Sequence, residues 1–138
     1  MRPVVLIGQR RPHEMCLFAA GIMLSVGYVF GPEQSTPLTQ QWQWIVASMY
    51  ALTFAGGVFG LIGCLWRTYS MSMGLEQTGL LLQSAGLVIY LVAVFTFAGW
   101  AAWIPLMIFS AWLLANLVRA WDIQRDVNAI RKAAARTE

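Results

Sequence analysis

Four long apolar stretches, separated by short segments, constrain the fold of this chain more than any other feature. A helix needs roughly 20 mostly apolar residues to cross the hydrocarbon core of a bilayer. The predicted helices cover residues 12–30, 42–66, 75–98 and 103–120. We therefore predict an all-α polytopic membrane protein, with four transmembrane helices in two antiparallel hairpins and a short cytoplasmic helical tail over residues 121–138.

The composition points to lipid as the main solvent of the chain. Of its 138 residues, 59% are hydrophobic and only 11% are charged, and the mean hydropathy is +0.62. A soluble core of this size cannot hide so much apolar surface. We expect one membrane domain over residues 1–138, in which the first apolar stretch is a retained anchor because no small-x-small cleavage site follows it.

The basic residues predict the orientation of the helices. They precede the first stretch, lie between the second and third, or lie at the end of the fourth and after it: Arg2, Arg10, Arg11, Arg67, Arg119, Arg125, Arg131, Lys132 and Arg136. By the positive-inside rule, both termini are cytoplasmic. The tryptophans agree, because Trp42, Trp44, Trp100 and Trp103 mark the opposite interface.

Helical spacing gathers small and polar residues on one face of the first and third predicted helices. These candidate polar stripes comprise Glu14, Gly21, Ser25 and Tyr28, and Glu76, Gly79, Gln83, Gly86 and Tyr90. Polar groups facing lipid are costly, so we expect both stripes to face protein. They line a polar path or, in the interpretation we favour, pack helices together with Gln83 hydrogen-bonded to a neighbour.

The two glutamates have a simple electrostatic explanation. Glu14 and Glu76 each fall in the first turn of a predicted helix, where the helix dipole stabilises a carboxylate. We favour this explanation over a role in proton coupling. In the fourth predicted helix, we expect Asn116 to make an interhelical hydrogen bond.

The second predicted helix carries two adjacent tracks of small residues at intervals of four. One track comprises Ala47, Ala51 and Ala55, and the other Gly56 and Gly60, followed by Cys64. Small residues let helix backbones approach closely. The tracks therefore predict tight packing, either within one molecule or between copies, and a homo-oligomer or a complex with other membrane proteins.

Residues that carry catalysis or bind metals are scarce. His13 is the only histidine, and Cys16 and Cys64 alone are too few ligands for zinc or copper. No nucleophile with a base and no phosphate-binding glycine loop can be assembled. We expect no enzyme activity, catalytic residue, cofactor or metal. The basic residues of the tail serve as a topology anchor or meet anionic headgroups or a cytoplasmic partner, and we expect no nucleic-acid partner.

The overall layout resembles the four-helix, holin-like membrane proteins in the lysis gene sets of phages that infect actinobacteria. The similarity lies in a short Arg-containing N-terminus, four spans, a tight last hairpin and a charged tail ending in RDVNAIRKAAARTE. It implies that the protein collects in the bacterial cytoplasmic membrane, oligomerises, and depolarises or permeabilises it during host lysis. No functional residue is carried over from this resemblance.

Two other functions fit a small membrane protein of this kind. One is a structural or regulatory subunit, as antiholins and superinfection-exclusion proteins are. The other is a small multidrug-resistance-like transporter, although Glu14 lies at the membrane edge and that family's G-x-A-Y-A-x-W signature is absent. Expressing the protein by itself distinguishes the three functions. A pore-former collapses the membrane potential, an exporter protects cells from cationic drugs, and a subunit does neither.

Overall fold

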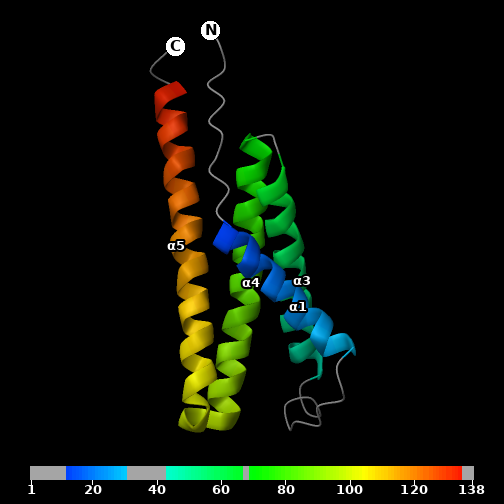
Figure 1. The fold of residues 1–138 in the computed structure, drawn as a ribbon. Coiled ribbons are helices and arrows are strands. Elements are labelled where there is room, and N and C mark those ends of the chain that lie inside the picture. The colour runs from blue at the N-terminus through cyan, green and yellow to red at the C-terminus, as the bar shows by residue number, and fades with distance from the viewer. Residues whose placement is uncertain (1–11, 31–42, 67–68, 135–138) are drawn as a thin grey trace.

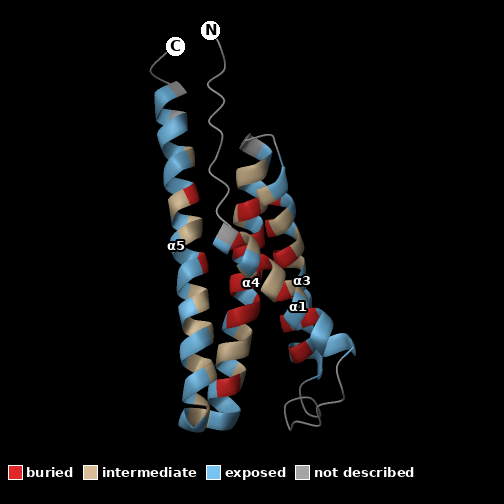
Figure 2. Ribbon diagram, in the orientation of Figure 1, coloured by how far each residue is buried: buried red, intermediate tan, exposed pale blue. Residues whose placement is uncertain are grey.

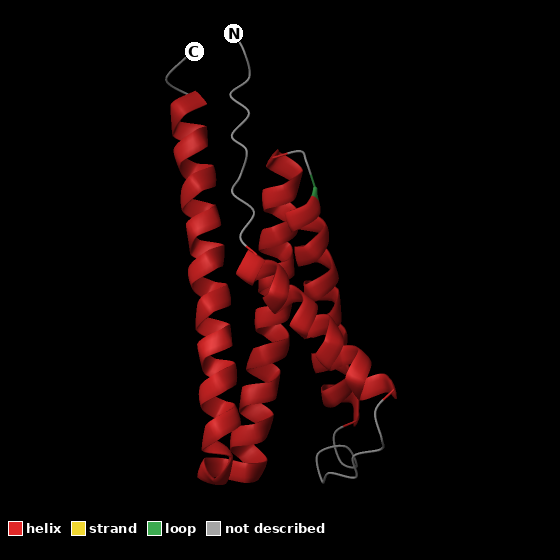
Figure 3. Ribbon diagram, in the orientation of Figure 1, coloured by secondary structure: helices red, strands yellow, loops and turns green. Residues whose placement is uncertain are grey.

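The computed structural model describes residues 12–30, 43–66 and 69–134, and these residues are helical apart from Trp66. No strand occurs among them (Figure 3). In chain order, the elements are α1 (Pro12–Phe30), α3 (Gln43–Leu65), α4 (Tyr69–Ala98), the 3₁₀ helix η1 (Gly99–Ala102) and α5 (Trp103–Ala134). The all-helical fold predicted from the sequence is confirmed for this part of the chain.

Three helical stretches of the described chain are long and apolar enough to cross a membrane. They are His13–Phe30, Gln43–Leu65 and Met71–Ile130, the last of which runs from α4 through η1 into α5. This length and composition are those of a membrane protein.

The helix bounds differ from the predicted ones mainly in α4 and α5. The predicted third helix began at Leu75, whereas α4 begins at Tyr69. The extra turns are joined to α3 by the Ser72 hydroxyl, which donates a hydrogen bond to the Gly63 carbonyl at 2.7 Å. The fourth predicted span ends at Ala120, and the helical tail predicted after it continues α5 without a break to Ala134.

The chain reverses between α4 and α5 at η1, so that the two helices lie side by side (Figure 1). Gly99 makes this reversal possible. Its φ of 53° lies in the left-handed region, which glycine adopts without the steric penalty of a Cβ.

The most extensive helix contact is between α3 and α4, and it depends on glycine. A Cβ added at Gly56 would lie 2.7 Å from the carbonyl oxygen of Gly79, and one at Gly63 would lie 2.5 Å from the backbone nitrogen of Glu76. The two backbones are therefore in direct contact, as small residues allow in membrane proteins. α1 packs on α3, and α5 packs on α4.

Burial is confined to the faces where helices meet (Figure 2), and many large apolar side chains are exposed on the outward surface. A small core joins Phe18, Leu80 and Ile123, which come from three different helices. Large apolar side chains such as Met23, Val92 and Met107 are more than half exposed. Such a surface suits lipid and not water.

Candidate functional site

Two carboxylates from different helices converge on one arginine. Arg119 on α5 donates a hydrogen bond from Nε to Oε1 of Glu76 on α4 at 2.9 Å, and its Nη2 lies 2.8 Å from the same oxygen. The Nε of Arg119 is also 2.9 Å from Oε1 of Glu14 on α1. These three residues, the ion cluster, tie α1, α4 and α5 together at one point.

The two contacts of Arg119 differ in kind. Nε carries a single hydrogen, and that hydrogen is directed to Glu76. The contact with Glu14 is therefore an ion pair without the same directional hydrogen bond. Both carboxylate side chains are 9% exposed and the arginine side chain is 20% exposed, so the electrostatic attraction is much stronger than that of a surface pair.

The helix-dipole explanation holds for Glu14 but is wrong for Glu76. Glu14 lies in the first turn of α1. Because α4 begins at Tyr69, Glu76 lies two turns inside the helix, where the backbone N–H groups are already bonded. Arg119 supplies the compensating positive charge instead.

A second polar group lies deeper in the bundle and links the same three helices. Gln83 on α4 donates from Nε2 to the Leu17 carbonyl of α1 at 3.3 Å. Asn116 on α5 donates from Nδ2 to Oε1 of Gln83 at 3.2 Å. Gln83 and Asn116 are 0% and 1% exposed, and each makes the interhelical hydrogen bond expected from the sequence.

The Leu17 carbonyl sets the orientation of both amides. A carbonyl oxygen can only accept, so the NH₂ group of Gln83 must face it, and the oxygen of Gln83 faces Asn116. Asn116 must then present its own NH₂ group to Gln83. Its Oδ1 is left without a donor among the described residues, and the Nε1–H of Trp112 is left without an acceptor among them.

The other members of the predicted stripes take several positions. Gly21 faces the amide of Gln83, and Gly86 faces Thr53. Buried Ser25 has its hydroxyl within 3.1 Å of the Tyr50 carbonyl on α3. Tyr28 is 40% exposed and stacks on Tyr50 with 4.1 Å between ring centroids, whereas Tyr90 contacts Phe109 on α5.

The two small-residue tracks of α3 have different surroundings. Gly56 and Gly60 are buried, the first against the α4 backbone and the second against the Phe18 ring and Gly79. Ala47 and Ala51 are exposed, and Ala55 is half-buried. The glycine track is used within the molecule, and much of the alanine track is left on its surface.

One group of residues has the ligand types of a metal site. An oxygen of Glu14, an oxygen of Glu76 and Sγ of Cys64 lie within 4.8 Å of one another. The Arg119 guanidinium already binds both carboxylates, and its positive charge opposes a metal ion at the same place. We therefore assign no metal to these residues. His13 is exposed, with Nε2 3.8 Å from Glu14.

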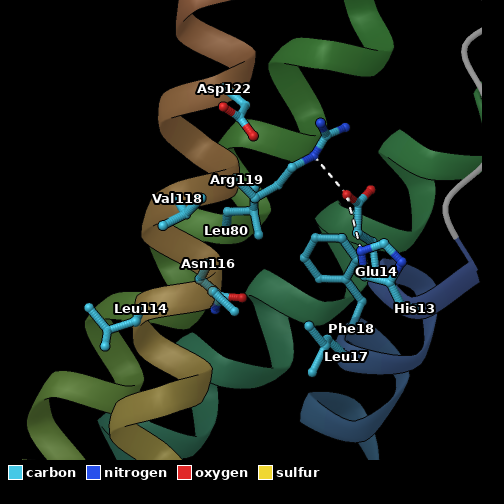
Figure 4. Close-up of a pocket in the computed structure, with 11 residues that line it drawn as sticks. His13, Glu14, Leu17, Phe18, Leu80, Leu114, Asn116, Val118, Arg119 and Asp122 are labelled. Carbon is cyan, nitrogen blue, oxygen red and sulfur yellow. Dashed lines mark ion pairs between the residues drawn. The ribbon is translucent and has the colours of Figure 1, made fainter.

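A cavity of about 340 Å³ opens between α1 and α5 beside the ion cluster (Figure 4). Its walls are mostly apolar, with charged side chains at one end and Asn116 at its inner side. The lining residues are His13, Glu14, Leu17, Phe18, Leu80, Leu114, Ala115, Asn116, Val118, Arg119 and Asp122.

Arg119 is the site residue that sequence reasoning missed, because it was assigned only to membrane topology. Trp112, Asn116, Arg119 and Ile123 follow one another at spacings of four, three and four. That spacing places them on one helix face. Asn116 and Arg119 both lie within the predicted helix 103–120, so this periodicity could have placed the arginine on the same face as the asparagine.

Comparison with known proteins returned no matching family model, no matching curated protein and no matching solved structure.

Proposed function

We propose that this chain is a holin-like protein of the bacterial cytoplasmic membrane, which oligomerises and depolarises or permeabilises that membrane. One observation carries the proposal: two groups of buried polar side chains, the ion cluster and the amides of Gln83 and Asn116, link three helices inside a bundle whose exposed large side chains are mostly apolar. Association of several copies brings such polar groups together, and they can then line a path for water and ions.

The proposed topology has four spans, two antiparallel hairpins and both termini in the cytoplasm. α1 and α3 form the first hairpin, and α4 and α5 form the second. α5 has 32 residues, about 48 Å at 1.5 Å per residue. It exceeds a hydrocarbon core of about 30 Å, so its C-terminal part extends into the cytoplasm.

This topology places the ion cluster near the cytoplasmic face. Arg119 follows Trp103, the first residue of α5, by 16 residues, about 24 Å along the helix. With Trp103 at the outer interface, the guanidinium reaches the inner part of the hydrocarbon core. Water can enter there once the helices separate, and the cluster is therefore a suitable place for a path to begin.

The limited contact between α1 and α5 supports a rearrangement of the helices in the membrane. α1 packs on α3 and α5 on α4, whereas α1 and α5 are separated in part by the cavity. The ion cluster and the amides of Gln83 and Asn116 bridge this separation. Breaking a few polar contacts thus frees α1 from α5 without dismantling the glycine-packed pair α3 and α4.

The test is expression of this protein alone in a bacterium, with membrane potential, viability and the amount of membrane-inserted protein followed together. We expect an abrupt, timed depolarisation, which Gly60→Leu and Gln83→Leu delay or abolish. Gly74→Ala is the control, because a Cβ at Gly74 meets nothing within 4 Å. Cells that keep their potential at a normal level of inserted protein would overturn the proposal and favour a regulatory subunit.

A further inference from the structure

The cavity between α1 and α5 is lined by a residue whose buried hydrogen-bond acceptor has no partner in the part of the chain that the structure describes. A buried acceptor, Oδ1 of Asn116, has no donor among the described residues, although buried polar groups are normally hydrogen-bonded. Figure 4 shows this side-chain oxygen pointing from α5 toward Phe18 on α1. Whatever fills the cavity can satisfy it only by donating a hydrogen.

The charges at the end of the cavity favour a positive occupant. Glu14, Asp122, Arg119 and the formally neutral His13 line it, and Glu76 pairs with Arg119. Three carboxylates against one guanidinium leave an excess of negative charge, and the guanidinium is already committed to Glu14 and Glu76. In surroundings of low dielectric constant, this imbalance attracts a cation.

The rest of the cavity selects an apolar body. Leu17, Phe18, Leu80, Leu114 and Val118 form its walls. Its volume of about 340 Å³ is at the small end of the range of roughly 300–1,000 Å³ for small-molecule sites. An inorganic cation would leave these walls unfilled, and a neutral hydrocarbon would leave Asn116 without a donor.

We propose that this cavity, whose lining also includes the carboxylates of Glu14 and Asp122, binds a small amphipathic primary ammonium ion, whose N–H donates to Oδ1 of Asn116 while its apolar body packs on Leu17, Phe18 and Leu80. This site shares Glu14 and Asn116 with the buried polar groups of the proposed function, but its occupancy does not require membrane permeabilisation. Binding is measurable in a protein that never forms a pore, so the two proposals fail independently.

The test uses the full-length protein in phosphatidylcholine nanodiscs, titrated with 4-phenylbutylamine by calorimetry, with empty nanodiscs subtracted. The neutral probe 4-phenylbutanol has the same apolar body and also a donor. We expect saturable binding of the amine and at least tenfold weaker binding of the alcohol. Equal binding of both probes, or no binding above that of empty nanodiscs, would overturn the proposal.

Two variants locate the binding site. Ala115→Phe fills the cavity without removing a polar group, and Asn116→Leu removes the acceptor; each is expected to weaken amine binding at least tenfold. Ala111→Phe is the matched control, because Ala111 is exposed on the same helix and does not line the cavity. Wild-type affinity in Ala115→Phe would refute this location, even if Asn116→Leu fails to fold.

The ammonium can belong to a free amine or to a lipid headgroup, and lipid composition separates the two. Nanodiscs containing phosphatidylethanolamine leave the affinity for 4-phenylbutylamine unchanged if free amines are the natural occupants. A fall of fivefold or more shows that the headgroup ammonium occupies the same site. Both outcomes support ammonium recognition and differ only in its source.

Discussion

The guanidinium of Arg119 on α5 and the carboxylate of Glu14 on α1 lie 2.9 Å apart, although the two helices make few other contacts. The same guanidinium binds Glu76 on α4. Arg119 thus neutralises part of the charge of two buried carboxylates and joins the helix at one edge of the bundle to the helix at the other.

Removing the arginine is expected to destabilise the fold strongly. Arg119→Met leaves Glu14 and Glu76 facing each other without a cation, and breaking a buried pair in this way typically costs about 3–5 kcal/mol. We expect a free energy of unfolding lower by about 3 kcal/mol, measured by denaturant titration in detergent micelles. Arg125→Met is the control, because Arg125 is exposed on the same helix.

A rescue experiment identifies charge as the cause. Glu14→Gln and Glu76→Gln, added to Arg119→Met, remove the uncompensated charges and should recover most of the lost stability. A triple variant no more stable than Arg119→Met would mean that the arginine acts through packing of its side chain and not through its charge.

A methyl group at the α3–α4 contact is expected to be costly. A Cβ at Gly79 would lie 2.6 Å from Cα of Gly60 and 2.7 Å from the Gly56 carbonyl oxygen. Backbone atoms cannot move aside as a flexible side chain does, so Gly79→Ala should lower the free energy of unfolding by about 2 kcal/mol. Gly74→Ala on the same helix meets no neighbour and should stabilise by about 0.5–1 kcal/mol. Equal stability of the two variants would show that the helices separate easily.

Much of this fold follows from the sequence, because the length of an apolar stretch and its flanking residues report directly on lipid burial. α1 coincides with its predicted range, and Gln83 and Asn116 face neighbouring helices as their polarity in an apolar helix requires. The start of α4 was not predicted, because its first turns are joined to α3 by a contact between Ser72 and Gly63 that local propensity does not report.

The site was predicted only in part. Single-helix periodicity shows which residues share a face, and it grouped Glu14 with Ser25 and Glu76 with Gln83. It does not show which faces meet, so the pairing of both glutamates with Arg119 required the tertiary structure. The cavity could not be predicted from the sequence either, because it results from the separation of α1 and α5 and not from any sequence motif.

The two amides of the interior are expected to be energetically coupled. Gln83→Leu leaves Nδ2 of Asn116 without its acceptor and the Leu17 carbonyl without its second donor. Each single substitution, Gln83→Leu or Asn116→Leu, should destabilise by about 1–2 kcal/mol. The double variant should cost less than the sum of the two by about 0.6 kcal/mol or more, as for other interhelical hydrogen bonds in membranes. Additive losses would show that this hydrogen bond contributes no stability.

The exposed alanine track of α3 is expected to be the contact between copies. Ala51 lies on the surface with small residues one turn away on either side, so a second helix can approach closely there. In a background of Cys16→Ala and Cys64→Ala, we expect Ala51→Cys to form disulfide-linked dimers when membranes are oxidised. Val92→Cys is the matched control, because Val92 is 61% exposed on α4 but is flanked by larger side chains.

A disulfide forms only when the two Cα atoms lie within about 7 Å of each other. Copies that meet at random in the bilayer seldom reach this distance, so efficient cross-linking reports a preferred contact. Cross-linking at Val92 that equals cross-linking at Ala51 would exclude the alanine track as the preferred contact and would leave oligomerisation to another face.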